Sequence, residues 1–156
     1  MRAFFTTSLA AALLGLSLHA HSQTAAVTVA RVGTFKQVQG EAWVGSRAAD
    51  RRSAVSGEGV QVSQRMSTGK TGAATLTLKD GTVVTMGPNS TMDLSTFEFN
   101  TTTQEGNFLL DLLQGSVRVV TGLLGKAHPE NFKIKTPTSV VGVRGTDFIV
   151  ETEAAQ

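Results

Sequence analysis

The residue types that could do chemistry are few and scattered in this chain. Beyond residue 21 the only histidine is His128, which precedes Pro129 in an irregular stretch where a solvated loop histidine is the expected role. Nucleophilic catalysis needs a nucleophile, a base and an orienting group that converge in space, and the sequence has no cysteine to supply a thiol. The acidic residues show no spacing that demands a carboxylate pair for glycoside cleavage. The sequence therefore predicts no catalytic residue and favours a protein that is not an enzyme.

Residues 122–127 read Gly-Leu-Leu-Gly-Lys-Ala and look superficially like a phosphate-binding loop. Such a loop needs glycine, four residues, and then Gly-Lys followed by serine or threonine. Val120 occupies the first glycine position here, and Ala127 replaces the hydroxyl that would bind the metal of a nucleotide. We expect no cofactor and no metal site in this protein.

Arg144 lies between Gly142 and Gly145, and two roles compete for it. Glycines in strand-like surroundings usually mark a bulge or a close approach of two backbones, with Arg144 paired to Asp147 or another acid. Alternatively, the planar donor fork of the arginine is presented to an anion. The structural role is favoured.

Most of the chain alternates apolar and polar residues in short runs, which is typical of strands. Turn-forming residues separate these runs at 67–72, 80–81 and 87–90, and a cap on local backbone amides is the default role of the aspartate at 80. The clearest apolar pairs are Val60 and Val62, Leu76 and Leu78, Val84 and Met86, and Met92 and Leu94.

Three stretches are harder to interpret. Residues 108–113 are rich in leucine, but their length and the Gln-Gly that follows favour a buried strand over a helix. Residues 47–59 carry charges among small residues and are expected to form an exposed loop, and one short helical turn is expected near Leu123. The sequence thus predicts an all-β domain, a short-strand meander that forms either a β-roll or solenoid-like structure or a sandwich.

The first residues are those of a secretory signal peptide. Arg2 precedes an apolar stretch over residues 4–18 that is too short to span a bilayer comfortably, and small residues follow it. We expect a signal peptide over residues 1–20 cleaved near Ala20, with cleavage after Ala26 as the alternative. Residues 21–156 then form a single domain with its recognisable core at about 60–150. This predicts a periplasmic or secreted protein without a transmembrane segment in its mature chain, and the formal net charge of +2 does not indicate nucleic-acid binding.

Several short motifs follow one another in the second half of the chain. They are an Asp-Gly-Thr turn, a Gly-Pro-Asn-Ser turn, a Gly-Ser-Val step, and a closing string from Thr-Pro to Gly-Thr-x-Phe. Together they resemble the signature of the FecR domain, a periplasmic sensor module of bacteria. The residues that carry the resemblance, mainly in structural roles, are Asp80, Gly81, Gly87, Pro88, Gly115, Thr136, Pro137, Gly142, Arg144, Gly145, Thr146 and Phe148.

The resemblance implies an envelope protein that binds a partner. In signalling members of the family the domain follows an inner-membrane helix and a cytoplasmic anti-sigma segment, and it relays the state of an outer-membrane transporter. We expect a stand-alone, non-enzymatic binding module of the bacterial cell envelope whose partner is an envelope protein or a glycan. The alternative is a component of iron-responsive, FecR-type cell-surface signalling that acts through a membrane-spanning partner.

The candidate interaction segment is residues 122–131. Its glycines and proline argue against regular structure, so apolar side chains within it are expected near the surface, rimmed by polar ones. The alternative is that both leucines fold back to cap the open end of the core. The candidate contact residues are Leu123, Leu124, Lys126 and His128.

Overall fold

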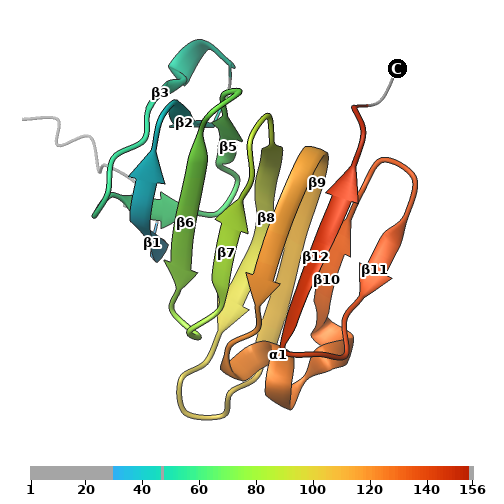
Figure 1. The fold of residues 1–156 in the computed structure, drawn as a ribbon. Helices are drawn as coiled ribbons and strands as arrows, with labels where there is room; N and C mark the ends of the chain where they lie inside the picture. Colours follow the sequence, from blue (N-terminus) through green and yellow to red (C-terminus); the bar gives the residue numbers. More distant parts are fainter. Residues whose placement is uncertain (1–29, 47, 155–156) are drawn as a thin grey trace, which may run out of the picture.

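The computed structural model describes residues 30–46 and 48–154, and this part of the chain is built mainly of strands (Figure 1). The expected signal peptide and its two expected cleavage sites, near Ala20 or after Ala26, lie outside the described residues. The all-β prediction is confirmed. The strands are β1 (Arg31–Gln39), β2 (Ala42–Gly45), β3 (Arg52–Ser53), β4 (Gly59–Gln61), β5 (Arg65–Thr68), β6 (Ala73–Leu78), β7 (Val83–Met86), β8 (Thr91–Phe99), β9 (Gly106–Val120), β10 (Phe132–Lys135), β11 (Val140–Gly142) and β12 (Asp147–Thr152).

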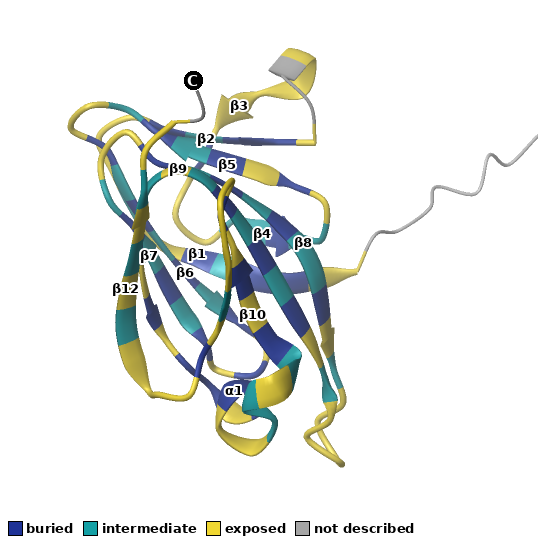
Figure 2. Ribbon diagram, turned by 90° about the vertical axis from the view of Figure 1, so that its right-hand side faces the viewer, coloured by how far each residue is buried: buried dark blue, intermediate teal, exposed yellow. Residues whose placement is uncertain are grey.

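The strands form one curled sheet with two wings that share β9. Wing A contains β4, β1, β6, β7 and β12 around the second half of β9. Wing B contains β3, β2, β5, β8, β10 and β11 around the first half. Buried and exposed residues alternate along the strands of both wings (Figure 2). The sheet thus curls around one core as an open half-barrel.

The long strand β9 changes its buried face half-way along. Phe108, Leu110 and Leu112 are buried in its first half, whereas the buried residues of the second half are Val117 and Val119. The buried positions therefore change from even to odd residue numbers along β9. This change occurs because Thr91 of β8 pairs with Gln114 and Met92 pairs with Leu112, which leaves Leu113 as an extra residue. An extra residue of this kind is a β-bulge, and it lets both halves of one strand face the same core.

Gly115 and a buried cluster of hydroxyls form the corner at which the sheet bends. Gly115 has a positive φ of 85°, and a Cβ there would lie 2.4 Å from the Ser90 Oγ. That Oγ accepts a 3.0 Å hydrogen bond from the Ser116 N–H, while the Ser90 N–H donates to Thr68 Oγ1 at 3.0 Å. Thr68 Oγ1 in turn donates to the Gly87 carbonyl at 2.6 Å. The Gly-Pro-Asn-Ser and Gly-Ser motifs are thus parts of one structural corner whose buried polar groups are paired.

Wing B also contains the only parallel pairing among the described strands, between β9 and β10. Phe108 and Phe132 are opposite each other in this register, and their rings stack with centroids 4.1 Å apart and planes 9° apart. Both rings are 0–1% exposed, so this stack is part of the core. The segment 108–113, which was ambiguous between helix and strand, is confirmed as strand.

The expectation of a plain exposed loop at residues 47–59 is partly wrong. A 3-10 turn, η1 (Ala48–Asp50), and the short strand β3 interrupt it, and Ala54 is buried. The Ala54 N–H donates to the Ala42 carbonyl at 2.9 Å. The local composition, with its charged residues, indicates only a loop. The strand forms because β3 pairs with β2, which lies earlier in the sequence.

Replacing Gly115 with valine tests the corner. A valine would occupy a positive φ and would collide with Ser90, so we expect the free energy of unfolding to fall by at least about 2 kcal/mol. The matched control is Gly145→Val, because φ is not positive there and no atom lies within 4 Å of a Cβ. We expect that control to change stability by less than about 0.5 kcal/mol in urea unfolding. Equal losses in the two variants would contradict the role given to Gly115.

Candidate functional site

One end of the curled sheet is covered by α1 (Leu123–Ala127) and the 3-10 turn η2 (Pro129–Asn131). Figure 1 shows α1 at the end of the sheet opposite the C-terminus of the chain. We call this region, together with the loop over residues 143–146, the α1 end.

The Asp-Gly-Thr turn fixes the position of α1. Asp80 accepts hydrogen bonds from the Thr82 N–H at 3.0 Å and from the Thr82 hydroxyl at 2.7 Å, so its predicted capping role is confirmed. Thr82 Oγ1 accepts the Gly122 N–H at 3.0 Å, and the Asp80 carbonyl accepts the Leu123 N–H at 2.8 Å. A Cβ on Gly122 would lie 2.3 Å from that carbonyl oxygen, which is why the residue that precedes the helix must be glycine.

The two adjacent leucines have different environments. Leu124 is 0% exposed and packs in the core, whereas Leu123 is 47% exposed. Leu123 thus lies at the surface, as expected of at least one of the two leucines, and the alternative that both cap the open end of the core is wrong because only Leu124 does so. The helical turn expected near Leu123 is confirmed, although it is only five residues long.

The closing string of the sequence folds beside α1. Thr136 and Ser139 close the β10–β11 turn, with the Thr136 N–H donating to the Ser139 carbonyl at 2.8 Å. After β11 the chain returns towards β9, where the Thr121 hydroxyl donates to the Gly145 carbonyl at 3.1 Å. The result is a hollow of about 370 Å³ between the helix and the loop. Its lining residues are Gly125, Lys126, Pro129, Arg144, Gly145 and Thr146.

The expected pairing of Arg144 with Asp147 is wrong. Asp147 of β12 instead accepts two hydrogen bonds, at 2.9 and 2.5 Å, from Arg118 of the neighbouring antiparallel strand β9. These hydrogen bonds, followed by the positive charge of Arg118, hold the pKa of Asp147 below its usual value. Arg144 remains exposed and makes no ion pair with a described residue.

The charge of Arg144 acts on Glu130 of the η2 turn. The pKa of Glu130 is lowered mainly by a hydrogen bond from its own backbone, and further by His128 and by the charge of Arg144. The His128 Nδ1 lies 3.3 Å from the Glu130 Oε1 at the rim. Of the predicted contact residues, Leu123, Lys126 and His128 thus share the α1 end with Arg144, while Leu124 lies beneath them.

The glycines of the closing string are not required by crowding. No atom lies within 4 Å of a Cβ built on Gly142 or Gly145, and neither has a positive φ. The expectation of a bulge or a close backbone approach at these positions is therefore wrong within the described fold. They leave an exposed stretch of backbone without side-chain cover beside Arg144.

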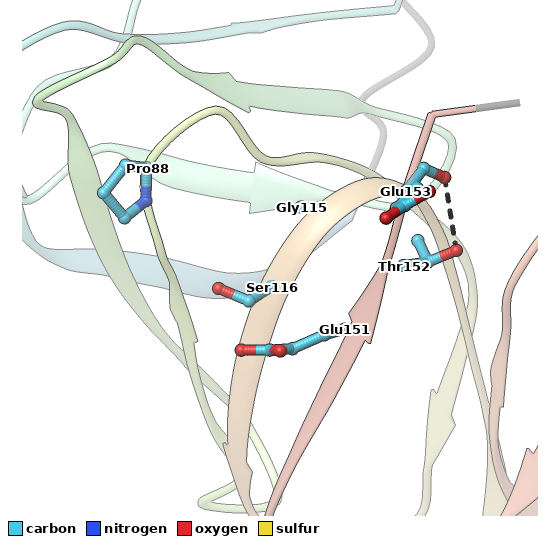
Figure 3. A pocket seen from close by; sticks show the side chains of 6 residues that line it. All are labelled: Pro88, Gly115, Ser116, Glu151, Thr152 and Glu153. Carbon is cyan, nitrogen blue, oxygen red and sulfur yellow. Dashed lines mark hydrogen bonds between the residues drawn. The ribbon is translucent and has the colours of Figure 1, made fainter. Parts of the chain in front are cut away.

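A second hollow, of about 470 Å³, lies next to the structural corner at the bend within β9 (Figure 3). Pro88, Gly115 and Ser116 line one side of it, and Glu151 and Glu153 of the C-terminal segment line the other. The Thr152 hydroxyl donates to the Glu153 carbonyl at 3.3 Å. These two glutamates were not predicted as site residues from the sequence, although the alternation along β12 places Glu151 on an exposed position.

Two further observations concern residues 30–46 and 48–154. No three of their histidine and acidic side chains are grouped so that they could hold a metal ion. No helix in this part of the chain has the length and apolar character needed to cross a membrane.

Comparison with known proteins gives one match. A family model described as FecR protein matches residues 64–156, which include the α1 end and the structural corner. No curated protein and no solved structure matches the chain significantly.

The two leucines of α1 provide a stability test. Leu124→Ala should lower the free energy of unfolding by about 2–4 kcal/mol, because it opens a cavity in a fully buried site. Leu123→Ala should change it by less than about 0.5 kcal/mol, because the side chain is half in solvent. Chemical unfolding of both variants measures the difference, and similar values would show that Leu123 is also core.

The pKa of Asp147 gives a second test. Because the pKa is lowered in the folded state, the Arg118 pair stabilises the fold at a pH above the ordinary aspartate value, and this contribution is lost as the pH falls through the lowered pKa. Arg118→Gln should raise the pKa of Asp147 towards its ordinary value in an NMR titration of carboxyl carbons. Arg144→Gln is the control and should leave it unchanged, whereas a shift with Arg144→Gln would reinstate the Arg144–Asp147 pairing.

Proposed function

Since the chain belongs to the FecR protein family, we propose that it is a non-enzymatic binding module of the bacterial cell envelope, periplasmic or secreted, that contacts its partner through the α1 end. The observation that carries the proposal is the exposed Leu123 on the same short helix whose Lys126, together with Arg144, lines a hollow. The partner in this proposal is an envelope protein.

The chemistry of the α1 end suits a partner with an apolar residue next to acidic ones. Leu123 provides an apolar contact, and interfaces commonly place such a residue within a polar rim. The guanidinium of Arg144 has no ion pair with a described residue, so it can form two parallel hydrogen bonds to a carboxylate. The open backbone at Gly142 and Gly145 allows the partner to approach the chain closely.

The family favours a second candidate function. FecR proteins are signalling regulators, so the same surface would serve iron-responsive cell-surface signalling through a membrane-spanning partner. The two candidates predict the same contact residues but different partners. A transporter or a sigma-factor regulator as partner supports signalling, and a glycan-bearing or adhesin-type envelope component supports the stand-alone module.

Site-specific cross-linking in cells tests both candidates. A photo-reactive amino acid placed at Leu123 should give a discrete cross-linked product, because the side chain is exposed at the proposed contact. The same amino acid at Ile149, which is 63% exposed on β12, is the matched control and should give none. Mass spectrometry of the product identifies the partner and so separates the two candidates.

Charge reversal supplies the second arm of the test. Lys126→Glu and Arg144→Glu should each weaken the cross-link at Leu123 by about ten-fold, because rim and contact charges steer partner binding. Lys70→Glu, on the turn before β6, is the control for the change in net charge. Equal cross-linking at Leu123 and Ile149, or no response to either charge reversal, would contradict the proposed contact surface.

A further inference from the structure

The outer face of wing B carries a groove that lies away from the α1 end. Trp43 of β2 is opposite Ser67 of β5, and Ser67 is opposite Thr91 of β8. Because Met66 and Met92 are buried beside them, the alternation of the strands turns Ser67 and Thr91 outward. The groove has a volume of about 240 Å³. Its lining residues are Trp43, Gly45, Arg51, Arg65, Ser67, Thr68 and Thr91.

A close approach at Gly45 brings an arginine into this groove. A Cβ on Gly45 would lie 2.8 Å from the Asp50 carbonyl oxygen and 3.1 Å from the Arg51 Cα, so only glycine lets the chain after β2 fold back so tightly. The guanidinium carbon of Arg51 then lies 3.9 Å from the centroid of the Trp43 ring. This cation–π contact holds the flat face of the guanidinium and leaves its N–H edge free to donate.

Arg51 differs from the arginines around it in having no acidic partner among the described residues. Arg65 donates two 2.7 Å hydrogen bonds to Asp93, which raise its pKa, and Arg52 pairs with Glu58. The charge of Arg65 is thus neutralised where it lines the groove. Among the described residues that line the groove, Arg51 therefore has the one guanidinium without an acidic partner, and it lies against Trp43 in a groove that Ser67 and Thr91 also line.

We propose that this groove binds the carboxylate-bearing ring of an acidic sugar. The N–H edge of Arg51 donates two hydrogen bonds to the planar carboxylate, which is the geometry that an arginine fork matches. The Ser67 and Thr91 hydroxyls, which make no hydrogen bond to another described residue, exchange hydrogen bonds with the ring hydroxyls. The volume suits about one sugar ring.

Other small ligands fit the same groups less well. A phosphate group carries more charge than one free guanidinium balances, and Asp93 already occupies the other arginine of the groove. A neutral sugar would leave the Arg51 fork without a partner. A simple carboxylate without hydroxyls would leave Ser67 and Thr91 unused.

Fluorescence gives a direct measurement, because Trp43 is the only tryptophan of the chain and there is no tyrosine. Titration of the purified protein with glucuronic acid should give a saturable change in the indole emission, with a Kd on the order of 1 mM for so small a ligand. Glucose, acetate and inorganic phosphate are the comparison ligands. Each should bind at least about five-fold more weakly than glucuronic acid.

Two arginine variants test whether Arg51 is the group that recognises the carboxylate of glucuronic acid. Arg51→Gln should weaken glucuronic acid binding at least about five-fold and remove its advantage over glucose, because the fork to the carboxylate is lost. Arg31→Gln, at an exposed arginine on β1 in wing A, makes the same charge change and should leave binding unaltered. Isothermal calorimetry repeats the comparison without relying on the indole, and circular dichroism checks that both variants fold.

The outcomes separate cleanly. Preference for glucuronic acid that depends on Arg51 supports the proposal. Equal binding of glucose or of phosphate, equal weakening by Arg31→Gln, or no saturable binding up to about 50 mM overturns it. Since the groove is on wing B, none of these results depends on the partner proposed for the α1 end.

Discussion

The switch of buried face within β9 is the constraint on which the rest of this fold depends. Four strands pair with β9 directly, β8 and β10 along its first half and β7 and β12 along its second. Without the extra Leu113, simple alternation would turn Ser116 and Arg118 into the core and Val117 and Val119 into solvent. A one-residue shift moves every side chain of a strand to the opposite face of the sheet. Without the extra residue, wing A could therefore not share a core with wing B.

The same constraint separates the structural and exposed parts of the molecule. At the corner the bend requires Gly115, and the buried hydroxyls of Thr68 and Ser90 satisfy the backbone groups that the bend would otherwise leave unpaired. At the far end of β9 the core is open until Leu124 fills it and the turn at Asp80 holds the helix in place. Three of the motifs that resemble the FecR signature thus act at two places on one strand: the Gly-Pro-Asn-Ser and Gly-Ser motifs at the bend within β9, and the Asp-Gly-Thr turn at its C-terminal end.

The sequence predicts the local features of this fold and misses those that depend on register. Apolar alternation and turn chemistry were enough for β6, β7 and β8, for the strand over 108–113 and for the cap at Asp80. The switch of buried face could not be predicted, because a leucine-rich run such as 108–113, interrupted only by Asp111, does not show which of its residues are buried. The Arg118–Asp147 pair and the stacking of Arg51 on Trp43 were also missed, since each depends on how distant or returning segments align.

The glycines of the chain fall into two physical classes, and the difference bears on function. Gly115 and Gly122 are imposed by the fold, through a positive φ in one case and a 2.3 Å approach in the other. Gly142 and Gly145 are not, yet glycine costs about 0.5–1 kcal/mol of extra backbone entropy wherever it is ordered. No crowding and no positive φ at these two positions requires glycine. Contact with a partner would offset the entropy cost, since a bare backbone beside Arg144 gives the partner both room and a charged donor, and this is the physical basis for placing binding at the α1 end instead of at the corner.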